Sequence, residues 1–413
     1  MSATTRVLVG LVSGALVGLA LDAYSPALAV SVADWIQPFG RLWLNALQMT
    51  VVPLVFALVV VGVNAASDAA ASGRIARHAL VVFVVLLTIG VTVAAVAAPL
   101  LYSLFTRHAA LTAALGGTVA PHAAVAAQAV GWADWLNGIV PSNALMAAAQ
   151  SAMLPLVVFA LFFGFALSHI EATRRESVLT FFQAVADTMI VTVRWVLWAA
   201  PLGVFALILS VCARAGMQMI GALGVYVLVE CTLYLMVTLL MLLVAWSWGG
   251  ERLRHYVPAL VPAQVVAAST QSSLASLPAM LESAVQRLGY PQPVAALVLP
   301  MAVSLFRLTS PVQYVASACF IAWALDIPLS PPQLIAGAAL AVVISLGSVG
   351  LPGQVSFMAT NLPVAQAMGV PVGPLALMLA VDTLPDAIAT LGNVTADITA
   401  VSVVTRQSAM DAS

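Results

Sequence analysis

Long apolar segments determine what this chain can fold into. Eight stretches of more than 20 residues contain few charged side chains. A helix needs about 20 such residues to cross the ~30 Å hydrocarbon core of a bilayer. The sequence therefore predicts an all-α membrane protein with eight transmembrane helices. These predicted helices cover residues 6–28, 41–65, 79–105, 143–170, 184–213, 219–248, 294–323 and 374–404.

The scarcity of charge leads to the same class of protein. Only 7% of the 413 residues are charged and 63% are hydrophobic, whereas soluble proteins carry roughly 25% charged residues. Most of the surface must therefore face lipid, which excludes a cytosolic enzyme, a secreted disulfide scaffold and a disordered protein. The 14 basic residues are all arginine, and the net charge of -1 leaves no basic patch for nucleic acid. The three cysteines fit no metal or disulfide spacing.

Two further apolar segments, 258–290 and 332–368, are interrupted near their middles by small residues and proline. Each segment is too short for two crossings of the bilayer and too broken for one. Irregular backbone at membrane depth is tolerated only where it is buried in protein or lines a wet cavity. We therefore predict that both segments are re-entrant helical hairpins.

The distribution of arginine predicts the orientation of the chain, because cytoplasmic loops carry the excess of basic residues. With the N-terminus inside, nine arginines fall on the inner side and two or three on the outer side. Both termini are then cytoplasmic, the first hairpin enters from the cytoplasm, and the second enters from outside. Each hairpin with its following helix forms a unit, and the two units have opposite orientation. Such inverted repeats with broken helices are typical of secondary transporters.

The last predicted helix contains several ionisable residues, which are costly inside a membrane. Asp386, Thr390, Asn393 and Asp397 lie at spacings that keep them on one helix face, and Asp382 precedes them by one turn. Three carboxylates on a lipid-embedded helix require cations or protons. We interpret this stripe as a binding site. The alternative interpretation is a buried polar network that only holds helices together.

The helix predicted at 294–323 contributes Ser304, Arg307 and Ser310. Arg307 is the only basic residue between Arg287 and Arg406. A guanidinium near the bilayer centre must meet an anion. Two interpretations are equally compatible with the sequence: a static pair with an aspartate, and a role in binding a substrate or an ion.

The tips of the two predicted hairpins supply the remaining polar groups. Ser272 and Ser273 place hydroxyls beside backbone amides, an arrangement that can hold a carboxylate. Glycines in the second tip let the backbone approach a ligand closely and let the tip move as a gate. The predicted gate residues are Gly347, Gly350, Pro352 and Gly353.

These motifs resemble the dicarboxylate/amino acid:cation symporters, the glutamate and aspartate transporter family. The resemblance rests on residues 270–273 and 347–353 in the two tips and on Asp386, Asn393 and Asp397 in the last helix. It covers nearly the whole chain and implies a homotrimer in the cell inner membrane. It also implies a transport domain that moves against a scaffold like an elevator. The coupling ion would be Na⁺ or H⁺, and no cofactor, metal or catalytic motif supports an enzyme.

The resemblance also implies domain boundaries and roles for individual residues. The scaffold would comprise residues 1–78 and 143–213. The transport domain would comprise residues 79–142, which include an external loop, and residues 214–413. Ser273 and Asn393 match positions that hold a substrate α-carboxylate, and Asp386 matches one that holds an α-amino group. The complete predicted substrate site is Ser272, Ser273, Arg307, Ser310, Asp386, Thr390 and Asn393. The predicted cation-binding residues are Ser304, Ser348, Asn393 and Asp397.

One part of the chain departs from the family pattern. At residues 306–310 the family has Asn-Met-Asp-Gly-Thr, whereas this chain reads Phe-Arg-Leu-Thr-Ser. Phe306 and Leu308 remove side-chain oxygens that hold two sodium ions in the family, and Arg307 adds a fixed charge. Where carriers of acidic substrates place an arginine on the last helix, this chain has Ala389. We therefore predict altered or reduced sodium coupling.

Arg307 allows two hypotheses. It replaces a sodium ion beside Asp397 or Asp386, which makes transport sodium-independent or proton-coupled, or it supplies the positive charge missing at Ala389 and binds a substrate carboxylate. The substrate class, a small amino acid or a dicarboxylate, stays open. A rival function is a paralogue that has lost transport and acts as a sensor or an anion channel. An intramembrane hydrolase is unsupported, because Asp382 and Asp386 come from one helix and have no partner acid on a facing one.

Overall fold

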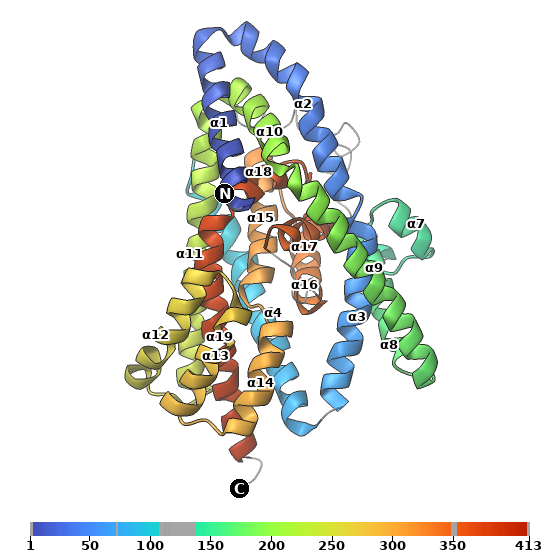
Figure 1. The fold of residues 1–413 in the computed structure, drawn as a ribbon, viewed down its shortest axis with the longest axis vertical. Coiled ribbons are helices and arrows are strands. Elements are labelled where there is room, and N and C mark those ends of the chain that lie inside the picture. The colour runs from blue at the N-terminus through green and yellow to red at the C-terminus, as the bar shows by residue number, and fades with distance from the viewer. Residues whose placement is uncertain are drawn as a thin grey trace.

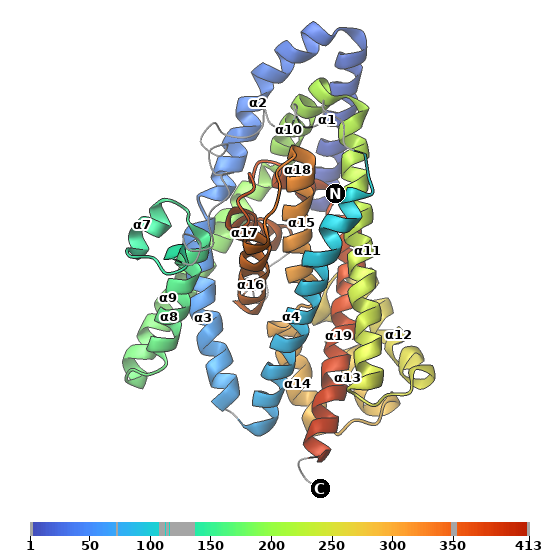
Figure 2. The same cartoon turned by 180° about the vertical axis from the view of Figure 1, so that it is seen from behind.

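The computed structural model describes residues 3–71, 73–106, 112, 115, 137–347 and 353–410. Nearly all of these residues are helical and none of them is in a strand, which confirms the all-α prediction. Figures 1 and 2 show an elongated molecule in which most helices follow the long axis. Within the described ranges, the helical stretches long and apolar enough to span a membrane are Pro26–Asp68, Arg74–Ser103, Ala172–Trp198, Met217–Ser247, Gln292–Leu325 and Leu384–Ser408, and the first and fifth of them contain a short break. Shorter apolar helices are Val9–Tyr24, Met153–Leu167, Ala200–Ala215 and Pro331–Leu346, and the count of eight crossings stays a prediction.

Proline in the first turn of a helix explains two breaks that the predicted spans missed. A proline ring clashes with the carbonyl four residues earlier and supplies no N–H. Pro53 therefore separates the helix Val51–Ala71 from Pro26–Gln48, and Pro201 separates Ala200–Ala215 from Ala172–Trp198. Each of the predicted spans 41–65 and 184–213 therefore consists of two helices, whereas we predicted one, and its crossing of a membrane stays a prediction. The helices that flank these two breaks are α2 (Pro26–Gln48), α3 (Val51–Ala71), α9 (Ala172–Trp198) and α10 (Ala200–Ala215), and α7 (Ala144–Ala149) and α8 (Met153–Leu167) precede α9.

The same effect interrupts the last two predicted spans, 294–323 and 374–404. Pro311 clashes with a carbonyl in the segment 306–308, which is not helical, and Pro385 produces a break at Asp382. Each span is therefore two helices rather than the continuous helix that we predicted. These helices are α14 (Gln292–Leu305), α15 (Thr309–Leu325), α18 (Leu375–Val381) and α19 (Thr383–Met410).

The two segments predicted to be hairpins each fold as a pair of helices that contact each other. The first pair breaks at Gln271, whose φ of 51° lies in the left-handed region, and its first helix begins before the predicted residue 258. Re-entry into a membrane stays a prediction for both pairs. The pairs are α12 (Leu253–Thr270) with α13 (Ser273–Glu282), continued by the π-helical turn η2 (Ser283–Arg287), and α16 (Pro331–Gly347) with α17 (Gly353–Ala367).

A central bundle brings the last helix against three others. Helices α4 (Arg74–Ser103), α11 (Met217–Ser247), α15 and α19 contact one another, and α12, α13 and α14 pack against α19. Gly392 permits the close approach of these helices. A Cβ atom at this position would lie 2.7 Å from Oγ1 of Thr238 on α11 and 2.9 Å from Cγ2 of Thr309 on α15. The polar stripe of α19 and the break before α15 therefore share one core.

A second group of helices lies at the end of the molecule opposite to α12, α13 and the C-terminus (Figure 1). Here α1 (Ala3–Tyr24) packs along α10, and α10 packs along α2. Gly10, Gly14 and Gly18 recur every four residues on the face of α1 that meets α10. A Cβ atom at Gly18 would lie 2.8 Å from the carbonyl oxygen of Leu209. Small residues at this spacing allow two helix backbones to pack closely inside a membrane.

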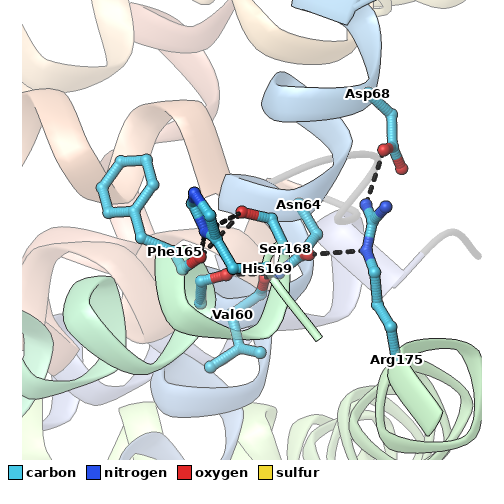
Figure 3. Close-up of polar contacts among 8 residues, drawn as sticks. Val60, Asn64, Asp68, Phe165, Ser168, His169 and Arg175 are labelled. Carbon is cyan, nitrogen blue, oxygen red and sulfur yellow. Dashed lines mark hydrogen bonds and ion pairs between the residues drawn. The ribbon is translucent and has the colours of Figure 1, made fainter. Parts of the chain in front are cut away.

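A polar junction joins α3, α8 and α9 (Figure 3). The side chain of Asn64 is fully buried, and its amide nitrogen donates to the carbonyl oxygens of Val60 and Gly164, both at 3.0 Å. Its amide oxygen accepts a hydrogen bond from Nε of Arg175 at 3.1 Å. The same guanidinium pairs with Asp68 at 2.5 Å. All polar atoms of the buried amide therefore have partners, as burial in apolar surroundings requires.

We expect Arg175→Met to destabilise the protein by about 1–3 kcal/mol, because the buried oxygen of Asn64 loses its donor. Arg174→Met is the matched control, since that side chain is 79% exposed and, among the described residues, its ion-pair partner is Glu171 alone. Removing an exposed pair of this kind costs roughly 0–1 kcal/mol. Thermal unfolding of the purified protein in detergent measures both effects. Equal shifts for the two variants would contradict a role for the junction.

Candidate functional site

The break between α14 and α15 is held by side chains from two other elements. Its residues 306–308 are not helical. The hydroxyl of Ser345, at the end of α16, donates to the carbonyl oxygen of Arg307 at 3.3 Å. The amide oxygen of Asn393 on α19 accepts from the backbone N–H of Thr309 at 2.9 Å. The second helix pair and the last helix therefore meet at this break.

The polar stripe of α19 faces the protein interior. Thr390, Asn393 and Asp397 are at most 4% exposed, and Asp386 is half-buried. The hydroxyl of Thr390 donates to the backbone carbonyl oxygen of Asp386 at 2.8 Å, so it is already engaged within its own helix. The structure therefore places the predicted stripe beside the break, where its side chains can meet a ligand rather than lipid.

Asp397 has an unusual environment for a carboxylate. Its side chain is 1% exposed, and neither carboxylate oxygen has a hydrogen-bond partner among the described residues. A buried carboxylate without donors is strongly unfavourable unless a cation or a proton accompanies it. The two carboxylate oxygens of Asp397 are therefore suited to bind one small cation or a proton.

Arg307 lies within electrostatic range of the acidic residues but does not pair with them. Its charge acts on Asp382, Asp386 and Asp397. Its guanidinium is half-buried and forms no ion pair with any carboxylate in the described part of the chain. A static Arg–Asp pair, one of the two interpretations of the sequence, is therefore absent from this arrangement. The guanidinium is available to an anionic ligand.

Apolar packing surrounds the two positions on either side of Arg307. The ring of Phe306 stacks on Phe83 of α4, with ring centroids 4.9 Å apart and an interplanar angle of 7°. Leu308 is fully buried and packs on Gly90 of α4, where a Cβ atom would lie 2.8 Å from its Cδ1. Hydrocarbon cannot coordinate a hard cation, which requires oxygen ligands. The junction of α4 with the break therefore offers no side-chain ligand at these two positions.

The first helix pair presents its tip near the same helices, since α13 contacts both α14 and α19. The hydroxyl of Ser272 accepts a hydrogen bond from the backbone N–H of Ala275 at 3.2 Å and so caps α13. Ser273 is half-buried at the first position of α13, and Ser304 and Ser310 flank the break. The hydroxyl of Ser272 is thus already engaged, and Ser273 is the freer of the two serines.

The second tip is described only at its edges. Gly347 ends α16 and Gly353 begins α17. The predicted cation ligand Ser348 and the predicted gate residues Gly350 and Pro352 lie outside the described residues. Their roles stay predictions.

Two residues that contact the site were not predicted from the sequence. Gln313 on α15 donates from its amide nitrogen to a carboxylate oxygen of Asp382 at 2.6 Å, and Ser345 holds the break as described above. Gln313 follows Arg307 by six residues on the helix after the break. A polar residue in an apolar helix is a signal that could have identified it.

Comparison with known proteins agrees with this arrangement. The profile of the sodium:dicarboxylate symporter family matches residues 3–407. The chain is 30% identical over 406 residues to the "Proton/glutamate-aspartate symporter" of Escherichia coli (strain K12), covering 97% of this chain and 92% of that protein. It is 28% identical to the "Proton/sodium-glutamate symport protein" of Bacillus caldotenax, covering 94% and 90%. It is 26% identical to the "C4-dicarboxylate transport protein" of Bacillus subtilis (strain 168), covering 92% and 87%.

Proposed function

Because the chain belongs to the sodium:dicarboxylate symporter family, we propose that it is a secondary active transporter that moves a small amino acid or a dicarboxylate across the cell inner membrane together with a cation. The observation that supports this most directly is the carboxylate of Asp397, buried without donors beside the break at 306–308. A structural carboxylate would have hydrogen-bond partners. One that must share its site with a cation or a proton need not have them.

The proposed movement is that of an elevator. Residues 1–78 and 143–213 form the scaffold, and residues 79–142 and 214–413 form the transport domain. The extensive packing of α10 against α1 and α2, compared with its smaller contact with α11 of the bundle, supports this division. The pairs α12–α13 and α16–α17 are the re-entrant hairpins, both termini are cytoplasmic, and three copies assemble.

The coupling ion is Na⁺ or H⁺, and the sodium dependence is altered or reduced. Asp397 fits a cation, whereas Phe306 and Leu308 are packed against α4 and do not. One relative is named as a symporter of glutamate with protons, and another as a symporter of glutamate with protons or sodium. Arg307 replaces one sodium ion as a tethered cation, and its action on Asp397 without an ion pair supports this role. Its alternative role is to bind a substrate carboxylate.

The substrate lies between the first tip and α19. Ser273 and the amide nitrogen of Asn393 hold a carboxylate, and Asp386 holds the ammonium group of an amino acid. Ala389 provides no charge for an acidic side chain, so either the substrate has none or Arg307 binds it.

Uptake into proteoliposomes tests the proposal. Purified protein is reconstituted, and labelled L-glutamate, L-aspartate, L-serine and succinate are offered under an inward gradient of Na⁺ or of H⁺. Accumulation above the external concentration requires a carrier driven by an ion gradient. A second function, that of a sensor or an anion channel, is favoured by the apolar packing of Phe306 and Leu308. It predicts no accumulation, and as a channel it predicts an anion conductance without coupled uptake.

A further inference from the structure

A second buried acid, Glu230, lies in the middle of α11. Its side chain is fully buried. The hydroxyl of Ser317 on α15 donates to one carboxylate oxygen at 3.2 Å, and the hydroxyl of Tyr234 approaches the other at 3.4 Å. The hydroxyl of Tyr226 lies 3.4 Å from that of Ser317. Glu230 therefore contacts neutral hydroxyls, and it forms no ion pair within the part of the chain that the structure describes.

Helix α15 connects Glu230 to the candidate site. Ser317 binds Glu230, and Gln313, one turn earlier on the same face, donates to Asp382 at 2.6 Å. The two carboxylates act on each other electrostatically. Asp386, the residue proposed to bind the substrate ammonium group, in turn acts on Asp382. Asp382 therefore lies within electrostatic range of both Glu230 and the substrate site.

The titratable and charged groups around Glu230 lie on α11 and α4 and at the two helix breaks that hold Asp382 and Arg307. Among the described residues, Asp382 is the one other carboxylate that acts on Glu230, and Arg307 acts on Asp382 rather than on Glu230. The remaining groups are thiol or phenol side chains, which are uncharged at neutral pH. These are Tyr226, Cys231 and Tyr234 on α11 and Tyr102 on α4. The prediction that Asp382 has no partner acid on a neighbouring helix is therefore wrong, because Glu230 on α11 interacts with it. Two interacting carboxylates with so little positive charge nearby are strongly disfavoured as a doubly ionised pair in a lipid-embedded bundle.

Tyr102 gives this pair a route to water. Its hydroxyl is buried and has no hydrogen-bond partner among the described residues, and Glu230 acts on it electrostatically. Tyr102 also lines a cavity of about 220 Å³ at the ends of α4 and α15, together with Ser103, Cys319 and Ile327. In the proposed topology these helix ends face the outside. This hydroxyl makes no hydrogen bond to Glu230, so water has to bridge the two groups during transfer. A phenol that water reaches can relay a proton, since it donates one and accepts another.

We propose that Glu230, together with Asp382, holds the proton that accompanies an anionic substrate, and that this proton arrives from the α4–α15 cavity through the hydroxyl of Tyr102. The inference rests on the proposed transport function and specifies its coupling ion. Water in the cavity gives up the proton, and a carboxylate oxygen of the pair accepts it. Protonation removes one negative charge beside the site, so an anionic substrate binds more tightly. By linkage, the bound substrate increases proton affinity to the same extent.

Glu230→Gln, which keeps the shape of the side chain but removes its titration, is the direct test. Accumulation of L-aspartate or succinate driven by a pH gradient should fall about tenfold or more. Exchange of labelled for unlabelled substrate needs no proton release, so it should stay within about twofold of the wild type. A pH-indicator dye in weakly buffered detergent solution should report proton uptake when substrate is added to the wild type. The variant should show none.

Glu251→Gln is the matched control. It removes a carboxylate just after α11 that accepts hydrogen bonds from Tyr290 and Ser402, and it should keep the pH-gradient drive. If Glu230→Gln does not fold, Tyr102→Phe decides, because it removes one hydroxyl and should slow only the pH-driven uptake. The inference would be overturned if accumulation driven by a pH gradient and proton uptake both persisted in Glu230→Gln. If Glu230→Gln does not fold, their persistence in Tyr102→Phe would overturn it. Neither outcome would contradict the proposed transport function. Wild-type uptake driven by sodium alone would likewise overturn the inference and leave the transporter intact. No uptake of any substrate by the wild type would instead refute the proposed function.

Discussion

Uptake by the Arg307→Met variant is expected to depend on sodium. The guanidinium of Arg307 acts on Asp397, whose oxygens are buried without donors. Removing the tethered charge leaves this carboxylate uncompensated, so a free cation must take its place before substrate binds. Because Phe306 and Leu308 still offer no oxygen, one ion rather than several should be recovered. Coupling between ions and ligands is typically 5–150-fold, so sodium should raise the apparent substrate affinity by roughly tenfold or more.

The measurement is substrate uptake into proteoliposomes at several sodium concentrations, with choline as the replacement cation. Arg194→Met is the matched control, since this arginine also lies on a long helix but is exposed on α9. The alternative hypothesis, in which Arg307 binds a substrate carboxylate, predicts a selective loss of anionic substrates and no new sodium dependence. Unchanged uptake and unchanged ion dependence would eliminate both hypotheses.

Asp386→Asn is expected to weaken the binding of amino acids by about 10- to 100-fold. A hydrogen bond to a charged group contributes about 1.5–3 kcal/mol, and each 1.4 kcal/mol corresponds to a factor of ten in Kd. The amide keeps the volume of the carboxylate but cannot neutralise an ammonium group. Dicarboxylates have no ammonium group, so their affinity should be retained or should increase as a negative charge is removed.

Thermal unfolding of the purified variant, titrated with L-aspartate and with succinate, separates these outcomes, because a ligand stabilises the folded state according to its affinity. Asp187→Asn is the control, since this aspartate is exposed on the long helix α9. An equal loss for both ligands would show that Asp386 supports the site as a whole and does not recognise the ammonium group.

The sequence predicted the helical class and the family because both depend on local or whole-chain patterns. Apolar stretches of sufficient length and the spacing of polar residues on the last helix are local properties. The breaks were harder to place. Pro311 and Pro385 are visible in the sequence, yet a proline can kink a helix or end it, and packing decides between the two.

The surroundings of the site residues could not be predicted, because they depend on contacts between distant segments. The replacement of oxygen ligands at Phe306 is evident from the sequence, but its stacking on Phe83 is not. Likewise, Glu230 on a long apolar helix suggests an interhelical contact, and only the fold brings it to Ser317 and near Asp382. Side chains 87 residues apart have no local signal that joins them.

The hydrogen bond between Thr309 and Asn393 has a consequence for what Asn393 can recognise. A backbone N–H only donates, so the atom of the amide that faces it is the oxygen. The nitrogen, with its two hydrogens, therefore points to the other side. A molecule that meets this nitrogen must present lone pairs, as a carboxylate does, and a metal ion cannot occupy that position. The nitrogen of Asn393 therefore suits the predicted role toward the organic substrate, and the predicted role toward a cation would have to use its oxygen, which already accepts the N–H of Thr309.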